Sequence, residues 1–91
     1  MATLFVTIKI MPETTDVNLR DLEERVKEKI KDFGGDVATV DVQPIAFGLS
    51  ALVISFLMNE SKGSTDPLEE EISSMEGVAS ATVTEVRRTV G

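Results

Sequence analysis

The sequence contains no cysteine, histidine, tryptophan or tyrosine. The lack of cysteine excludes disulfides and thiol nucleophiles, and the lack of histidine as well excludes Cys/His zinc sites and the commonest general base. The remaining carboxylates show no paired spacing that suits general acid and base catalysis. We therefore expect a protein that is not an enzyme and that binds neither a metal ion nor a cofactor.

Basic residues and long apolar runs are also scarce. Nine Lys and Arg stand against sixteen Asp and Glu, a formal net charge of -7, which opposes binding to a phosphate backbone. No stretch approaches the roughly 20 apolar residues of a membrane span. Residues 1–16 alternate between apolar and polar and lack the basic start of a signal peptide. We expect a cytoplasmic protein with no direct nucleic-acid partner and no membrane partner.

The composition fits one small domain over residues 1–91. Hydrophobic residues make up 42 % and charged residues 27 % of the chain, which is ordinary globular usage. A chain of this length buries about 60 to 65 % of its unfolded surface and has a modest stability reserve. The pattern therefore predicts one self-folding unit.

The first half of the chain predicts a strand followed by a helix. Apolar and polar residues alternate over residues 3–11, the period of a half-buried strand. Apolar residues then recur at helical spacing over residues 19–33, where Asp16 or Asn18 is placed to cap the start and the pair Gly34-Gly35 to stop the end. We expect this helix to lie on a sheet.

Two dissimilar strands are expected next. Residues 37–43 form a short polar strand, and because Pro44 at its end has no N–H to donate, an edge position is favoured. Residues 49–58 are apolar at nearly every position, which is typical of a central strand.

A loop and a second helix follow. Residues 59–65 read as a loop, and the run from Asp66 combines an N-cap, Pro67 at the first helical position and Glu69 as capping-box partner. Gly77 is expected to stop the helix.

The last strand is expected over residues 78–88, with a bulge near Glu85 because its apolar residues change parity there. The order strand, helix, strand, strand, helix, strand favours the split βαβ arrangement. This is an α+β fold with an antiparallel four-stranded sheet in order 4-1-3-2 and both helices on one face.

Two features stand out as candidate binding residues. Phe47, between Ala46 and Gly48, is an aromatic at the entrance to a strand, where it either joins the core or offers a knob to a partner pocket. Arg87 and Arg88 form a basic pair near the end of an acidic chain, and such arginines are usually solvated or locally paired.

Four segments of the sequence carry a resemblance to a known family. Together they resemble archaeal elongation factor 1-beta over essentially the whole chain, with "PIAFGL" as the most specific part. The family is similar to the C-terminal catalytic domain of the eukaryotic elongation factor 1-beta subunit. The segments are "TIKIMPE" at 7–13, "DVNLRDLEE" at 16–24, "QPIAFGLSAL" at 43–52 and "MEGVASATVTEVRR" at 75–88.

The resemblance implies a ferredoxin-like fold and guanine nucleotide exchange on elongation factor 1-alpha, a GTPase that carries aminoacyl-tRNA. It implies that Phe47 inserts into a pocket of the GTPase. It also implies that Arg88, with Arg87 beside it, stands where eukaryotic relatives have a lysine that reaches toward the magnesium and phosphate site. The rival interpretation is a regulatory small-ligand or dimerisation module of the same fold. We expect the free protein to be a monomer.

Overall fold

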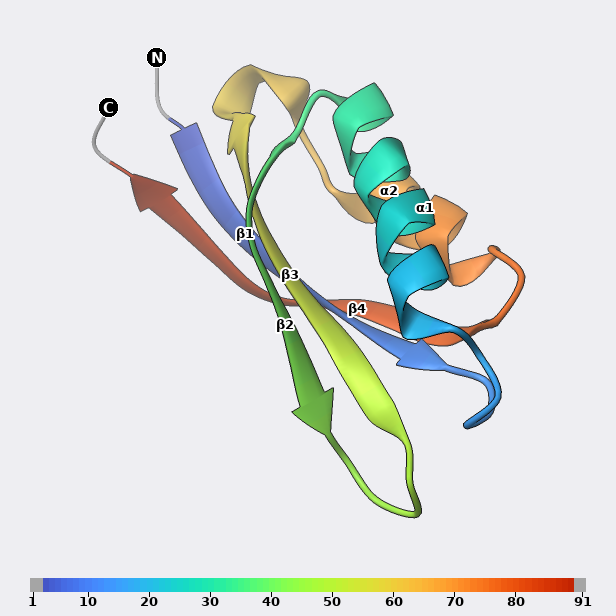
Figure 1. Cartoon of the computed structure of the whole chain (residues 1–91). Coiled ribbons are helices and arrows are strands. Elements are labelled where there is room, and N and C mark those ends of the chain that lie inside the picture. The colour runs from blue at the N-terminus through green and yellow to red at the C-terminus, as the bar shows by residue number, and fades with distance from the viewer. Residues whose placement is uncertain (1–2, 90–91) are drawn as a thin grey trace.

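The computed structural model describes residues 3–89 as one four-stranded sheet with two helices (Figure 1). The elements occur in the order expected from the sequence. They are β1 (Thr3–Pro12), α1 (Leu19–Phe33), β2 (Asp36–Pro44), β3 (Ser50–Asn59), η1 (Glu60–Lys62), α2 (Asp66–Ser73) and β4 (Val78–Thr89).

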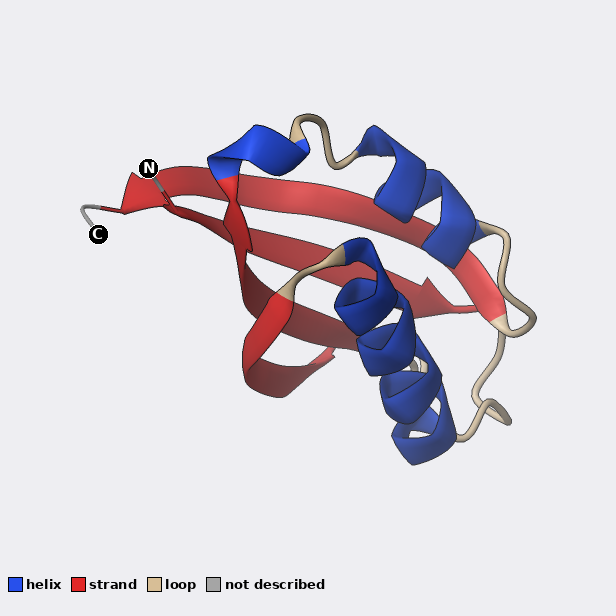
Figure 2. Ribbon diagram, turned by 90° about the horizontal axis from the view of Figure 1, so that it is seen from above, coloured by secondary structure: helices blue, strands red, loops and turns tan. Residues whose placement is uncertain are grey.

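The sheet is antiparallel in the order β2-β3-β1-β4, which is the predicted order 4-1-3-2 read from the other edge. The predicted ferredoxin-like α+β fold is therefore confirmed. The apolar third strand is central and the polar second strand is an edge, as expected. The sheet is strongly twisted, and its strands fan out in the view from above (Figure 2).

The core fills the space between the helices and one face of the sheet. Alternate residues of β1 point into it, so that Val6, Ile8 and Ile10 are fully buried. Their cross-strand partners on β3 and the inner stripes of the two helices complete it: Leu22, Val26, Ile30, Leu52, Ile54, Phe56, Met58, Leu68 and Ile72. The other face of the sheet carries no helix.

α1 begins and ends with the residues that the sequence indicated. The side chain of Asn18, rather than Asp16, accepts from the backbone N–H of Asp21 at 3.1 Å. Gly34 closes the helix in the left-handed region at φ 101°. The Nζ of Lys29 lies 2.9 Å from the Glu71 carboxylate of α2, and this hydrogen bond and opposite charge raise the pKa of Lys29 above its usual value.

The capping box predicted for α2 is wrong. The N-cap is Thr65, which makes no side-chain capping bond, and the amide of Asp66 donates to the Ser64 hydroxyl at 3.0 Å. The Glu69 carboxylate turns to β4 instead, where it accepts from the backbone N–H of Val83 at 2.7 Å. Because β4 is an edge strand, an acceptor from α2 satisfies an amide that the sheet does not use.

Two further expectations are corrected. Residues 60–62 of the predicted loop form the short helix η1. α2 ends at Ser73, so Gly77 does not stop it but forms a turn at φ 89° ahead of β4. The guanidinium of Arg25 donates to the Glu76 carbonyl at 3.1 Å and ties this turn to α1.

The bulge predicted near Glu85 is confirmed. The register of β4 against β1 shifts between Thr7 and Ile8, whose partners are Glu85 and Val83. A second shift, between Met11 and Pro12, was not expected. Within residues 3–89, no helix is long and apolar enough to cross a membrane.

Candidate partner-binding site

The turn between β2 and β3 projects beyond the body of the molecule (Figure 1). It is closed by two hydrogen bonds, from the amide of Ile45 to the Leu49 carbonyl and from the amide of Leu49 to the Ala46 carbonyl, both 2.9 Å. Phe47 and Gly48 occupy its apex with φ of 54° and 79°. Phe47 is the only non-glycine residue with positive φ in the described part of the chain. Such a conformation costs a bulky residue of order 1 kcal/mol, so the turn retains a ring that its backbone disfavours.

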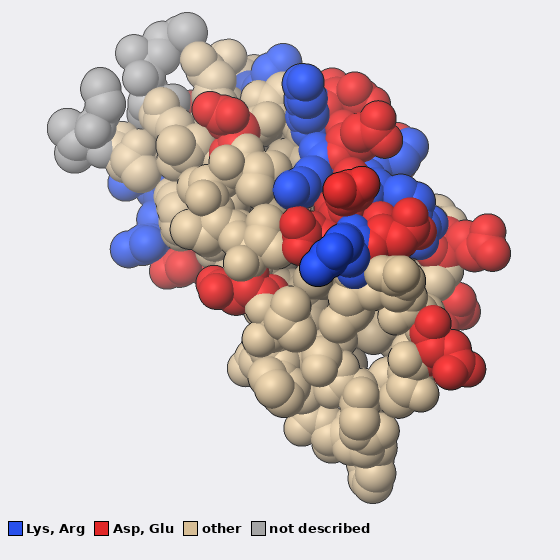
Figure 3. All heavy atoms as spheres, viewed as in Figure 1, with Lys and Arg blue, Asp and Glu red and all other residues tan. Residues whose placement is uncertain are grey.

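The Phe47 ring points into solvent, and 96 % of the residue is exposed. The alternative that Phe47 belongs to the core is therefore wrong. The aromatic that fills the core is Phe56, which is fully buried in β3. Figure 3 shows the hairpin end as a surface without charged atoms on the side viewed, and no Asp, Glu, Lys or Arg occurs in residues 42–59.

The loop between β1 and α1 lies beside this turn at Gly48. Thr15 is the closest neighbour of Gly48, with its Cγ2 atom 3.5 Å from the position of an added Cβ. A small hollow of about 50 Å³ separates the two segments. Since that spacing leaves room for a side chain, Gly48 is required by its positive φ rather than by crowding.

Arg88 lies at the far end of the sheet and is not free. It stands opposite Leu4 of β1, so it belongs to the face that carries the helices. Its Nη2 atom bonds to the Oε1 atom of Glu60 in η1 at 2.5 Å, with both side chains largely exposed. The contact crosses β1, since η1 follows β3 on the other side of that strand.

Arg87 lies on the opposite, uncovered face of the sheet. Its guanidinium carbon stands 5.0 Å from the centre of the Phe5 ring, and its Nε atom lies 3.1 Å from the Glu85 carboxylate. The local pairing that is usual for surface arginines is thus observed for both residues.

The structure does not bring the predicted site residues together. Ala46, Phe47 and Gly48 precede the start of β3, whereas the arginines lie beside Thr3, which pairs with Asn59 at the end of β3. At about 3.3 Å per residue, the ten residues of β3 separate the two groups by about 30 Å. They form two separate groups at opposite ends of the sheet.

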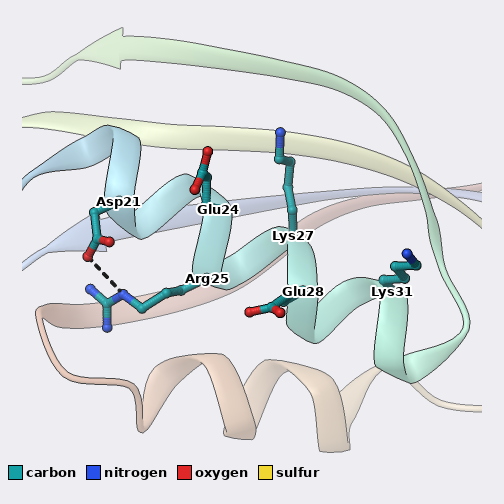
Figure 4. Close-up of a pocket in the computed structure, with 6 residues that line it drawn as sticks. All are labelled: Asp21, Glu24, Arg25, Lys27, Glu28 and Lys31. Atoms are coloured by element: carbon teal, nitrogen blue, oxygen red, sulfur yellow. Dashed lines mark hydrogen bonds and ion pairs between the residues drawn. The ribbon is translucent and has the colours of Figure 1, made fainter.

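The largest hollow described on the surface of residues 3–89 does not form a comparable site. The hollow of about 460 Å³ on α1 is lined by three acidic and three basic side chains: Asp21, Glu24, Arg25, Lys27, Glu28 and Lys31 (Figure 4). These charges compensate one another, with Asp21 bonded to Arg25 at 3.1 Å. No group of Asp or Glu side chains within residues 3–89 is arranged to hold a metal ion.

Sequence reasoning missed three residues around these points. Glu60, the partner of Arg88, lies 28 positions away from it, and no sequence signal joins them. Val42 and Ile45 are exposed apolar residues in the segment that leads up to Phe47. The long uncharged stretch over residues 42–59 is the sequence signal that could have indicated Val42 and Ile45.

The fold and the exposed tip define a small α+β binding domain of ferredoxin-like type, whose most distinctive surface element is an aromatic at a hairpin apex. The family model described as the EF-1 guanine nucleotide exchange domain matches residues 5–89. Elongation factor 1-beta of Methanothermobacter thermautotrophicus is 41 % identical and covers 97 % of this chain and 98 % of its own length. That of Staphylothermus marinus is 36 % identical, with 97 % and 98 % covered. The chain belongs to the elongation factor 1-beta family of guanine nucleotide exchange domains.

Solved structures share the fold at lower identity. The C-terminal domain of the MgtC protein from Mycobacterium tuberculosis aligns with a TM-score of 0.63 and 12 % identity, covering 97 % of this chain and 88 % of that one. The ACT domain from GTP pyrophosphokinase of Chlorobium tepidum aligns with a TM-score of 0.55 and 18 % identity, covering 96 % and 99 %. At these identities the likeness shows the fold alone.

Proposed function

We propose that this protein is the nucleotide exchange factor of elongation factor 1-alpha. It binds that GTPase in the cytoplasm as a monomer, promotes replacement of GDP by GTP and so regenerates the form that binds aminoacyl-tRNA. The protein makes and breaks no covalent bond and uses no metal or cofactor of its own. The single observation that carries the proposal, beside family membership, is the exposed Phe47 ring on its strained turn.

Phe47 is the anchor of the complex. An exposed ring on a projecting turn reaches a pocket without rearrangement of the body of the protein. Aromatic anchors of this kind contribute roughly 2 to 4 kcal/mol to an interface. Ala46 and Gly48 shape the turn, the first through its carbonyl and the second through its positive φ.

Arg88 acts at the nucleotide, with Arg87 beside it. A GTPase holds the phosphates on a glycine-rich loop and its lysine, with Mg²⁺ bridging phosphate oxygens to protein. A second cation about 4 Å from that charge repels it by roughly 4 kcal/mol at an effective dielectric of 20. Because Arg is a planar donor of several hydrogen bonds, the alternative is that it clamps a carboxylate or phosphate and acts by positioning rather than by entering the metal site.

The separation of Phe47 from the arginines assigns binding and nucleotide release to different ends of the sheet. Binding free energy gained at the hairpin holds the protein on its partner while Arg88, about 30 Å away, acts at the nucleotide. By linkage, the factor by which this protein binds the nucleotide-free GTPase more tightly than the nucleotide-bound GTPase is also the factor by which it lowers the affinity of the GTPase for nucleotide. The partner must therefore present a pocket and a nucleotide site at this spacing.

Release of a fluorescent GDP from elongation factor 1-alpha tests the proposal. The protein is expected to accelerate release, Phe47→Ala to slow it by weakening the complex, and Arg88→Ala to slow it when the complex is saturated. If the unaltered protein does not change the release rate, the proposed function is wrong. If one variant behaves as the unaltered protein does, the role given to that residue is wrong.

The rival, a small-ligand or dimerisation module, retains only the likeness of fold to domains such as the ACT domain. It predicts dimers at rising concentration and no effect on any GTPase. Sedimentation of the free protein distinguishes the two, since the exchange factor is expected to remain a monomer.

A further inference from the structure

The exposed apolar residues of this protein gather at one end. Four large hydrophobic residues are exposed within residues 3–89, and three of them belong to the β2–β3 hairpin: Val42 at 53 %, Ile45 at 41 % and Phe47 at 96 %. Single exposed apolar residues are ordinary, whereas several in one uncharged segment mark a contact surface. The hairpin therefore offers an apolar surface larger than the Phe47 ring.

Val42 lies on the face of the sheet that carries the helices. It pairs with Leu52, which pairs in turn with Ile10, and both of those partners are fully buried. Residues directly opposite one another in an antiparallel pair share a face. Val42 is nevertheless half exposed, because the hairpin extends past the helices (Figure 1).

The alternation of β2 continues beyond the core. Val37 and Val40 on the helix side are partly buried and pack against the core. Val42 continues their row into solvent, while the intervening residues Asp41 and Gln43 on the other face are polar. Val37 and Val40 are explained by the core, whereas Val42 is not. An exposed apolar residue there, followed by Ile45 and Phe47 in the same uncharged segment, indicates a surface that a partner covers.

We propose that the docking surface for elongation factor 1-alpha extends along this hairpin from Phe47 at its tip, through Ile45, to Val42 on the helix-side face of β2, and that an apolar element of elongation factor 1-alpha covers it. This inference rests on the proposed function. The partner element carries no unpaired charge at its centre, because residues 42–59 offer none to pair with. Phe47 anchors the contact, and Val42 sets how the hairpin lies against it.

Two substitutions on adjacent residues test this face. Val42→Thr and Gln43→Thr place the same residue on opposite faces of β2, at positions that are both exposed. Val42→Thr is expected to weaken binding to elongation factor 1-alpha about tenfold, for the loss of apolar contact area. Gln43→Thr is expected to stay within about twofold of the unaltered protein. Titration calorimetry measures both, and Ile45→Thr is a further variant of an exposed apolar residue in the same hairpin.

The outcomes separate the two proposals. If Phe47→Ala weakens binding and neither Val42→Thr nor Ile45→Thr does, the extended surface is wrong and the proposed function stands. If Val42→Thr and Gln43→Thr weaken binding equally, the partner pairs with the β2 edge rather than with its helix-side face, and the inference is also overturned. If the protein and elongation factor 1-alpha do not bind at all, the proposed function fails with it. Thermal unfolding of each variant excludes loss of the fold as the cause.

Discussion

The two ends of the sheet differ in how their candidate binding residues are satisfied in the free protein. At the hairpin end, Phe47 is almost fully exposed and its backbone is held in a conformation unfavourable to it. At the other end, Arg87 and Arg88 are each paired within the chain, with Glu85 and Glu60. The hairpin gains nothing from its aromatic in the free protein, whereas the arginine end is satisfied without a partner. If both ends contact elongation factor 1-alpha as proposed, the first end does so without losing a contact of its own, and the second must give up its present ion pairs.

The largest expected effect comes from breaking both ends at once. Because the two points lie about 30 Å apart and share no contact, Phe47→Ala and Arg88→Ala are expected to act independently. With roughly 2 to 4 kcal/mol lost at the hairpin and about 1 to 3 at the arginine, the double variant loses roughly the sum of both. The measurement is kcat/KM for nucleotide exchange, converted to a free energy for each of the four proteins.

The test is whether the free-energy losses of the two single variants add up in the double variant. A double variant no slower than the worse single variant would show that the two ends act as one coupled unit. That result would remove the distinction between anchoring and exchange, even with both single effects confirmed.

A smaller effect, of order 1 kcal/mol, is expected on the stability of the free protein. Asparagine tolerates positive φ far better than phenylalanine, and an exposed ring contributes no buried area. Phe47→Asn is therefore expected to raise the free energy of unfolding by about 1 kcal/mol while weakening the complex as much as alanine does. Urea unfolding and binding measurements on the same preparation check the two effects.

A matched control exists in the core. Phe56→Leu removes an aromatic of the same type from a fully buried position and is expected to lower stability by about 1 kcal/mol. If Phe47→Asn were destabilising in the same way, the ring would have a structural role and the contrast between the ends would be wrong.

The features that could be predicted from the sequence are those for which burial of apolar side chains determines the structure. Alternation in residues 3–11 and the apolar run at 49–58 predicted an outer and an inner face and a central strand. The parity change near Glu85 predicted its bulge, because a strand must keep its apolar side on the core. In a sheet with one buried face, a period of two fixes which residues of a strand point into the core.

The features that did not follow depend on competition between polar groups. Glu69 was placed to cap its own helix but bonds to Val83, 14 positions away, since Ser64 already accepts from the nearby amide. The contact between Glu60 and Arg88 has the same character. The sequence leaves two places for Phe47, the core or a partner pocket, because the alternation of a strand does not extend into its turn, and only the structure shows that the ring is exposed.

The smallest effect tests whether the arginine end is restrained by its own acid. Glu60→Gln keeps the shape of the side chain and removes the charge that holds Arg88. Exposed ion pairs are worth at most about 1 kcal/mol, so exchange is expected to quicken by no more than about fivefold, and less at high salt because the pair is then screened. Glu71→Gln is the control, since it removes the same charge from an exposed pair with Lys29 between the helices. Slower exchange with Glu60→Gln alone would mean that Glu60 holds the guanidinium where it acts, and the arginine end would then be as prepared for its partner as the hairpin is.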